Sequence, residues 1–329
     1  MANPAASETA RLTGVSRLFA FDRMRPRTRE AIGFYLCILP WILGFLAFTL
    51  GPMIYSLYLS LTKYDIIAAP RWTGLDNYIN IFFHDDIFWK SMKATAYYSF
   101  GAVPLRLLFG LFLAVLLNQA IKFRPFFRTL FYLPAVMSGV AVSLLWLWVF
   151  NPEFGVVNYI LSWFGIEGPR WIYSEQWAVP SLIIMSAWDA GAVMIVFLAG
   201  LQGVPTSLYD AAEVDGAGAL RKFVNVTLPI LSPVILFNLV IGVVNSFQVF
   251  TQAYVMTQGG PHYATYFMVL NIYYSAFTDL RMGYASALAW ILFVVTLLFT
   301  LLIFRSTSFW VYYESEFDRG SAGKAKGRK

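Results

Sequence analysis

The chain has little charge for its length. Only 13% of its 329 residues are Asp, Glu, Lys or Arg, whereas soluble domains average about 25%. One cysteine, Cys37, lies in an apolar run, so neither a disulfide nor a thiolate metal centre is predicted. The two histidines, His84 and His262, fall in predicted loops far apart in the sequence, which argues against a zinc site. The sequence therefore predicts no metal site, and its 59% hydrophobic residues indicate a membrane protein.

Motifs for ATP binding and nucleophilic catalysis are also missing. The sequence has no Gly-x-x-x-x-Gly-Lys-Ser/Thr phosphate-binding loop, because Gly323-Lys324 is followed by Ala325. It has no Gly-x-Ser-x-Gly nucleophile motif either, which disfavours a membrane-embedded hydrolase. We therefore predict no catalytic residue, no cofactor bound by this chain, and no enzymatic activity.

Six segments are apolar and long enough to cross a bilayer, whose hydrocarbon core is about 30 Å thick and needs about 20 helical residues. The first is longer than one span requires and is predicted to kink at Gly51-Pro52. The predicted spans are Ala31–Thr62, Ala94–Leu117, Thr129–Phe150, Ala178–Leu201, Ile230–Phe250 and Gly283–Phe304. They predict an all-α, polytopic bundle of six transmembrane helices.

The Lys and Arg residues outside these spans are distributed unevenly. With the N-terminus inside, the inner segments 1–30, 118–128, 202–229 and 305–329 hold 17 of them, and the outer loops hold six. Cytoplasmic loops are enriched in Lys and Arg, so both termini are predicted to be cytoplasmic. The first 30 residues and the last 25 would be basic tails flanking a transmembrane domain at 31–304, and the first tail lacks the apolar stretch of a cleavable signal peptide. The net charge of +6 is then a topology signal, and nucleic acid is not a predicted partner.

The predicted inner loop at about residues 202–229 contains signals for a helix of its own. A serine can cap a helix with an aspartate three residues later, two alanines favour helix with little bulk, and a glycine can end it. A Leu-Pro pair can then start the next helix. In chain order these residues are Ser207, Asp210, Ala211, Ala212, Gly216, Leu228 and Pro229. Such a short helix with a small surface could dock in a groove of a partner protein.

This loop resembles the EAA loop of permease subunits in binding-protein-dependent ABC importers. That loop has Glu-Ala-Ala, three residues, Gly, nine residues and then Ile-x-Leu-Pro. The same spacing runs here from Asp210 to Pro229, with Asp210 in place of Glu and Val226 in place of Ile. The resemblance implies the type I ABC importer permease fold in a bacterial inner membrane, and a loop that couples the permease to an ATPase.

Further stretches resemble the sugar branch of that family, most closely the maltose-type F or glycerol-phosphate-type A permease of a heterodimeric pair. They are Phe126–Pro134, Phe197–Gln202, Gln248–Phe250, Gly259–Pro261 and Gly283–Ala287. The resemblance implies import of a sugar, oligosaccharide or sugar derivative. It also implies a second homologous permease, two ATPase subunits that bind ATP and Mg²⁺, and an extracytoplasmic solute-binding protein as partners, besides membrane lipid.

Four amide side chains in and after the fifth predicted span are candidates for a solute path. Asn238, Asn245, Gln248 and Gln252 are spaced by seven, three and four residues, which places them within a sector of about 80° on a helix. Amides donate and accept hydrogen bonds, as sugar hydroxyls require. Hydrogen bonding between helices is the alternative role, and the sequence does not separate the two.

Two charged residues lie near the middle of predicted spans, where an isolated charge is costly. Arg106 and Asp189 lie about half-way through theirs, so an ion pair between them is the simplest prediction. The alternatives are an Arg106 that faces an anionic sugar, and salt bridges to the second permease.

An ion-coupled secondary transporter is the rival interpretation. Such a protein is expected to show inverted repeats or helices broken near the middle of the membrane. Six spans of uniform pattern and the spaced inner loop argue against it. We therefore predict a permease subunit driven by ATP hydrolysis on partner subunits.

Overall fold

The computed structural model describes residues 26–312, so most of the two predicted basic tails lies outside the described residues. The chain divides into two compact units, Met1–Tyr58 and Leu59–Lys329, which are described in turn.

The described part of the first unit belongs to one helical run. Helix α2 (Pro26–Phe45) continues through a π-helical turn, η2 (Leu46–Leu50), into α3 (Gly51–Ser60). The N–H of Gly51 donates to the carbonyl of Leu46, five residues back, immediately before Pro52, which has no N–H to donate. The feature predicted as a kink at Gly51-Pro52 is therefore a local change of hydrogen bonding. Residues Glu30–Ser60 form one uninterrupted helix of 31 residues, long and apolar enough to span a membrane.

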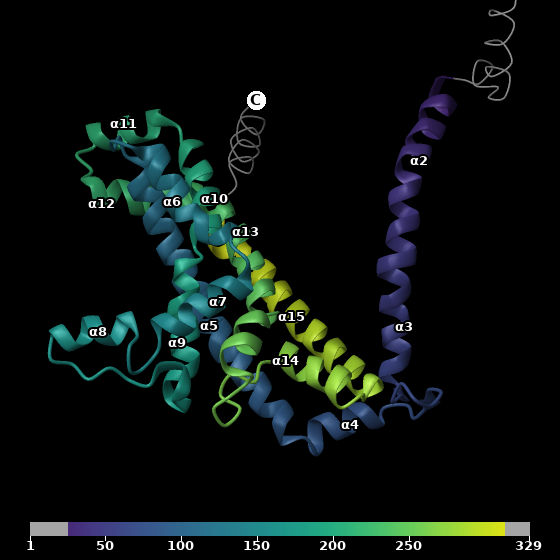
Figure 1. The fold of residues 1–329 in the computed structure, drawn as a ribbon. Helices are drawn as coiled ribbons and strands as arrows, with labels where there is room; N and C mark the ends of the chain where they lie inside the picture. The colour runs from purple at the N-terminus through teal and green to yellow at the C-terminus, as the bar shows by residue number, and fades with distance from the viewer. Residues whose placement is uncertain (1–25, 313–329) are drawn as a thin grey trace, which may run out of the picture. The chain divides into compact units, whose positions relative to one another are not determined.

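The regular structure of the second unit, over its described residues 59–312, is helical apart from one short hairpin (Figure 1). In the hairpin, β1 (Thr62–Lys63) and β2 (Arg71–Trp72) pair antiparallel. Three long helical runs are unbroken: α5 (Asp86–Asn118), a run from Ala219 to Phe247, and α15 (Met282–Trp310). The shorter elements include α4 (Asp76–Phe83), α8 (Val156–Trp163), the 3₁₀ turn η3 (Trp171–Tyr173), α11 (Thr206–Val214), η5 (Ala253–Thr257), α14 (Met268–Tyr273) and η6 (Tyr274–Thr278).

Two of the six predicted spans are broken. Helices α6 (Arg124–Val136) and α7 (Gly139–Val149) meet at 100°, and α9 (Glu175–Trp188) and α10 (Gly191–Gln202) meet at 45°. The prediction of continuous helices here is wrong, because hydropathy reports apolar composition and not backbone continuity. Counted with each broken pair as one span, the described residues contain up to six spans, so the all-helical membrane bundle is confirmed.

Helix α5 is the centre of the second unit and packs against α9, α10 and α13 (Leu228–Phe247). Close packing depends on Gly110, where a Cβ would lie 2.8 Å from Val193 Cγ1 on α10. Gly191 plays the same part at the start of α10, because a Cβ there would collide with the carbonyl oxygen of Phe131 on α6. The broken pairs are thus held against α5 and against each other.

Candidate functional site

The helix predicted in the inner loop is present as α11, which lies with α12 (Ala219–Lys222) at one end of the second unit (Figure 1). Its N-cap is Pro205 in extended conformation, without a side-chain cap. Ser207 is the second residue of the helix, so the predicted serine cap is wrong. Proline fixes its own φ near −65°, and here Pro205 at φ −60° and ψ 128° sets the entry to the helix without a capping hydroxyl. Asp210 lies within the helix and is exposed, so it is no cap either.

Gly216 ends the α11 segment as predicted, with a positive φ of 73°. The N–H of Ala217 donates to the carbonyl of Ala212 at 2.9 Å, and the N–H of Gly216 to that of Glu213 at 3.0 Å. This is the Schellman arrangement, in which a residue of left-handed conformation closes the helix. A Cβ on Gly216 would meet no atom within 4 Å, so glycine is required by backbone conformation and not by space.

Two side-chain contacts fix α11 to the segment that follows it. The hydroxyls of Tyr209 and Thr227 lie 2.9 Å apart, and Lys222 Nζ donates to Glu213 Oε2 at 2.6 Å. The hydrogen bond from Lys222 lowers the pKa of Glu213. Because the folded-state pKa lies below the unfolded one, this contact is present at neutral pH and is lost as the pH falls through the lowered pKa.

The predicted restart at Leu228-Pro229 is wrong. The helix already begins with α12 and passes through a π turn, η4 (Phe223–Thr227), before α13. Pro229 lies in the first turn of α13, where a missing N–H is tolerated after the wider π turn. The inner loop is therefore one short helix joined to the base of a long span.

The surface of α11 and α12 is open for contact. No residue of α11 is buried, and Val214 and Leu220 are 89% and 77% exposed. A groove of about 520 Å³ runs between the start of α11 and the start of α13. Its lining is largely apolar and includes Pro205, Leu208, Val226, Pro229, Ile230 and Pro233. Exposed apolar patches of this kind mark interaction sites.

The two charged residues within the spans lie together, as predicted. Arg106 Nη2 donates to Asp189 Oδ2 at 3.0 Å and approaches the Asp189 carbonyl at 3.4 Å. Asp189 is the residue at which α9 ends. The pair therefore joins the central helix α5 to the break between α9 and α10.

Two cavities lie beside Arg106, and both are lined by Arg106 and Tyr98. The first, of about 140 Å³, lies at the breaks of both bent pairs and is also lined by Pro134, Gly139, Ser186, Asp189 and Gln252. The second, of about 160 Å³, is lined by Asn238 and Asn245, among others. Within the described residues, the buried Nε of Arg106 has no hydrogen-bond partner. The site thus offers polar atoms to a small ligand between apolar helices.

The four candidate amides do not share one helical face. Helix α13 ends at Phe247, and Gln248 follows with non-helical ψ, so Gln252 belongs to the next segment. Asn238 is buried and donates to the carbonyl of Val234 on its own helix. Asn245 lines the second cavity and Gln252 the first, while Gln248 is not among the residues that line either. The prediction that they lie within one sector of a helix is wrong, because it assumed one continuous helix from Asn238 to Gln252.

Sequence reasoning missed Tyr98, Pro134, Gly139 and Ser186, which complete these cavities. One signal was present: Ser138-Gly139 is a turn dipeptide inside an apolar run, close after a proline. Tyr98 and Ser186 gave no comparable signal, since single Tyr and Ser residues are common in apolar helices.

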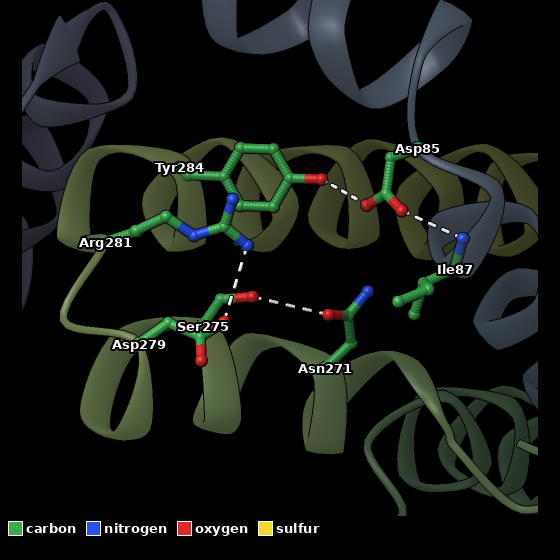
Figure 2. A network of polar contacts seen from close by, with 7 residues as sticks. All are labelled: Asp85, Ile87, Asn271, Ser275, Asp279, Arg281 and Tyr284. Atoms are coloured by element: carbon green, nitrogen blue, oxygen red, sulfur yellow. Dashed lines mark hydrogen bonds and ion pairs between the residues drawn. The ribbon is translucent and has the colours of Figure 1, made fainter.

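At the other end of the second unit, a polar network joins the starts of α5 and α15 (Figure 2). Asp85 Oδ1 accepts from the N–H of Ile87 at 2.8 Å, and its other oxygen accepts from the hydroxyl of Tyr284. The guanidinium of Arg281 lies over the Tyr284 ring, 4.6 Å from its centroid, and 3.4 Å from Asp279. One carboxylate thus caps α5 and fastens it to α15.

The neighbouring Gly283 brings the hairpin into the same junction. Its N–H donates to the carbonyl of Tyr64 at 3.1 Å. A Cβ on Gly283 would collide with the carbonyl of Thr62, so this close approach needs glycine. The Gly283–Ala287 stretch therefore has a structural role at the end of the bundle away from α11.

Comparison with known proteins identifies the class. Residues 106–309 match the family described as "Binding-protein-dependent transport system inner membrane component". The chain is 44% identical over 301 residues to the "Probable ABC transporter permease protein YesP" of Bacillus subtilis, covering 90% of this chain and 97% of that protein. It is 32% identical over 281 residues to the "Trehalose/maltose transport system permease protein MalF" of Thermococcus litoralis, covering 84% and 94%. A crystal structure of a bacterial alginate ABC transporter, in complex with a periplasmic protein bound to an alginate pentasaccharide, matches with TM-score 0.75 and 26% identity over 87% of this chain and 97% of that one.

The chain therefore belongs to the family of binding-protein-dependent transport system inner membrane components. It is a multi-pass inner-membrane permease subunit of an ABC importer, and so a transport subunit rather than an enzyme. The predicted permease fold is confirmed. One argument against a secondary transporter, the absence of broken helices, fails because two spans are broken. The family match supports the importer instead.

Proposed function

We propose that this permease imports a sugar, oligosaccharide or sugar derivative. The relatives support this class, because one is named for trehalose and maltose, and the matching crystal structure is of an alginate transporter in complex with a periplasmic protein bound to an alginate pentasaccharide. A second homologous permease and two ATPase subunits that bind ATP and Mg²⁺ would complete the transporter, with a solute-binding protein at the outer face.

The observation that carries the solute path is that two cavities share Arg106 in their linings. The first lies where α5 faces the breaks of the bent pairs, and the second lies between α5, α10 and α13. Both mix apolar walls with hydroxyl, amide and charged groups. Small-molecule sites have this composition. Each cavity is smaller than an oligosaccharide, so passage requires the helices around the breaks to move apart.

We expect Gln252→Ala and Asn245→Ala each to lower uptake while the complex still assembles. Each removes an amide from the lining of one cavity, and a hydrogen bond of this kind contributes about 0.5–1.5 kcal/mol. Gln248→Ala is the matched control, since Gln248 is not among the residues that line either cavity. Uptake into proteoliposomes gives the first readout, and size-exclusion chromatography the second. Unchanged uptake with a complex that dissociates in detergent would assign these amides to helix–helix contact.

We expect both termini to face the cytoplasm, with residues 202–229 on the same side, because the inner segments hold most of the Lys and Arg. A protease added to intact spheroplasts should leave a C-terminal tag uncut and should remove it after lysis. Cleavage of the tag in intact spheroplasts would contradict this orientation.

The substrate class is tested on the cognate solute-binding protein. A thermal-shift screen of neutral and acidic mono- and oligosaccharides should find a ligand that raises its melting temperature. If only amino acids, peptides or metal ions bind, the sugar assignment is wrong while the family assignment stands.

A further inference from the structure

The segment between α7 and α9 forms an ordered lobe with an exposed aromatic surface. Its helix α8 ends at Trp163 and is followed by Phe164 and by Gly165, which has φ +69°. The N–H of Ile166 donates to the carbonyl of Leu161 at 3.1 Å, and that of Gly165 to Ser162 at 3.0 Å. These two bonds close the helix in a Schellman arrangement, so the side chains of α8 have fixed directions.

The inner side of the lobe is fastened to the bundle. Asn158 donates to the carbonyl of Pro152 at 3.0 Å and accepts from Trp171 Nε1 at 2.6 Å. Trp171 stacks on Phe150, with ring centroids 5.2 Å apart. Val157 and Leu161 pack against the same core. These contacts join the lobe to the bundle.

The outer side of the lobe is apolar and has no partner among the described residues that would cover it. Tyr159, Trp163 and Phe164 are 62%, 68% and 74% exposed. The rings of Tyr159 and Trp163 pack against each other, with their centroids 5.3 Å apart. No charged residue occurs from 154 to 166; Glu153 and Glu167 flank this stretch. In Figure 1, α8 projects to one side of the second unit, beside α9.

We propose that α8 and the turn after it lie in the outer lipid–water interface, with Tyr159, Trp163 and Phe164 inserted at the level of the headgroups. The lobe would then be a membrane anchor rather than an aqueous loop. Tyr and Trp are enriched at this depth, because each combines an apolar ring with a polar group. The assignment of α8 to the outer side of the membrane depends on the proposed orientation of the chain. The assignment of its depth to the headgroup level does not.

Lipid fits this surface better than a solute-binding protein does. A binding protein docks transiently, so the apolar face would be in water for much of the cycle, and large exposed apolar patches are rare on water-facing surfaces. Aromatic residues at the ends of the two spans that the lobe connects are exposed as well. Trp148 near the end of α7, and Tyr173 and Trp177 around the start of α9, are 54%, 52% and 43% exposed. The same bilayer surface can cover all of them.

Spin labelling in the assembled transporter tests the proposal. Cysteine would be introduced as Trp163→Cys or Tyr159→Cys in a Cys37→Ser chain with cysteine-free partners, reconstituted in phosphatidylethanolamine and phosphatidylglycerol vesicles. Collision rates of the label with oxygen, which concentrates in lipid, and with a water-soluble nickel chelate report its depth. Glu167→Cys is the matched control in the same lobe. We expect oxygen to dominate at 159 and 163, and nickel to dominate at 167.

Two results would overturn the proposal. Nickel accessibility at 159 and 163 equal to that at 167 would place the lobe in water. Low accessibility to both reagents would place the aromatic face against protein, either the second permease or another subunit. Neither result depends on which solute is transported, so failure here would leave the proposed function untouched.

Discussion

Gly216→Val is expected to abolish solute-stimulated ATP hydrolysis and uptake while the chain still inserts into the membrane. The Schellman turn needs φ +73° at this position, a conformation that a β-branched residue resists at a cost of about 1–3 kcal/mol. A penalty of that size shifts a conformational population about 5- to 150-fold. The α11 segment would then present a changed end to the ATPase. Hydrolysis and uptake by the reconstituted complex are the measurements.

Gly218→Val is the matched control for this substitution. Gly218 has φ −68° and ψ 170°, which β-branched residues adopt readily, and neither glycine has an atom within 4 Å of an added Cβ. Gly216→Asn should be milder than Gly216→Val, because asparagine tolerates the left-handed region. Ala212→Arg should also uncouple the transporter, by adding bulk to a half-buried position of α11. Normal solute-stimulated hydrolysis and uptake in both Gly216→Val and Ala212→Arg would show that this loop is not the coupling element.

Arg106→Gln and Asp189→Asn are each expected to destabilise the complex, and the double substitution should be milder than the sum of the two. Each single change leaves a charge between apolar helices, which is more costly than removing both. Coupled neighbours differ from additivity by about 0.5–3 kcal/mol. The Asp189 side chain is 45% exposed, so the lower part of that range is expected. Thermal unfolding of the unsubstituted protein and the three variants in nanodiscs measures the coupling.

Strictly additive effects in this cycle would contradict the pair as an energetic unit. Arg106 lines both cavities, so it could also contact the solute. Measuring uptake separates this role from a role in stability. A double variant that is stable but inactive would mean that one of these charges also meets the solute.

How far the sequence could predict this molecule depends on the range of the interactions concerned. Apolar length predicted the spans, and the local signal at Gly216 predicted the end of α11. Both properties are decided within about 20 residues. The ion pair was predictable because a charge inside a membrane needs a partner, and the predicted spans contained one basic and one acidic residue, Arg106 and Asp189.

The breaks at Asp189 and near Gly139 were not predicted, because they depend on packing between spans. Gly191 is placed by the carbonyl of Phe131, 60 residues away in sequence, and not by a local pattern. The prediction that the four solute-path amides share one helical face was wrong for the same reason. Their common face required α13 to continue past Phe247, and the end of that helix is a tertiary property.

The central claim, that this chain couples ATP hydrolysis on partner subunits to sugar import through residues 202–229, is tested most directly by uptake into proteoliposomes. The vesicles would contain the complete transporter and the binding protein loaded with its sugar. The account predicts uptake that requires ATP inside, persists when ionophores collapse proton and sodium gradients, and is lost in Gly216→Val but not in Gly218→Val. Uptake that continues without ATP and disappears with the ionophores would contradict it.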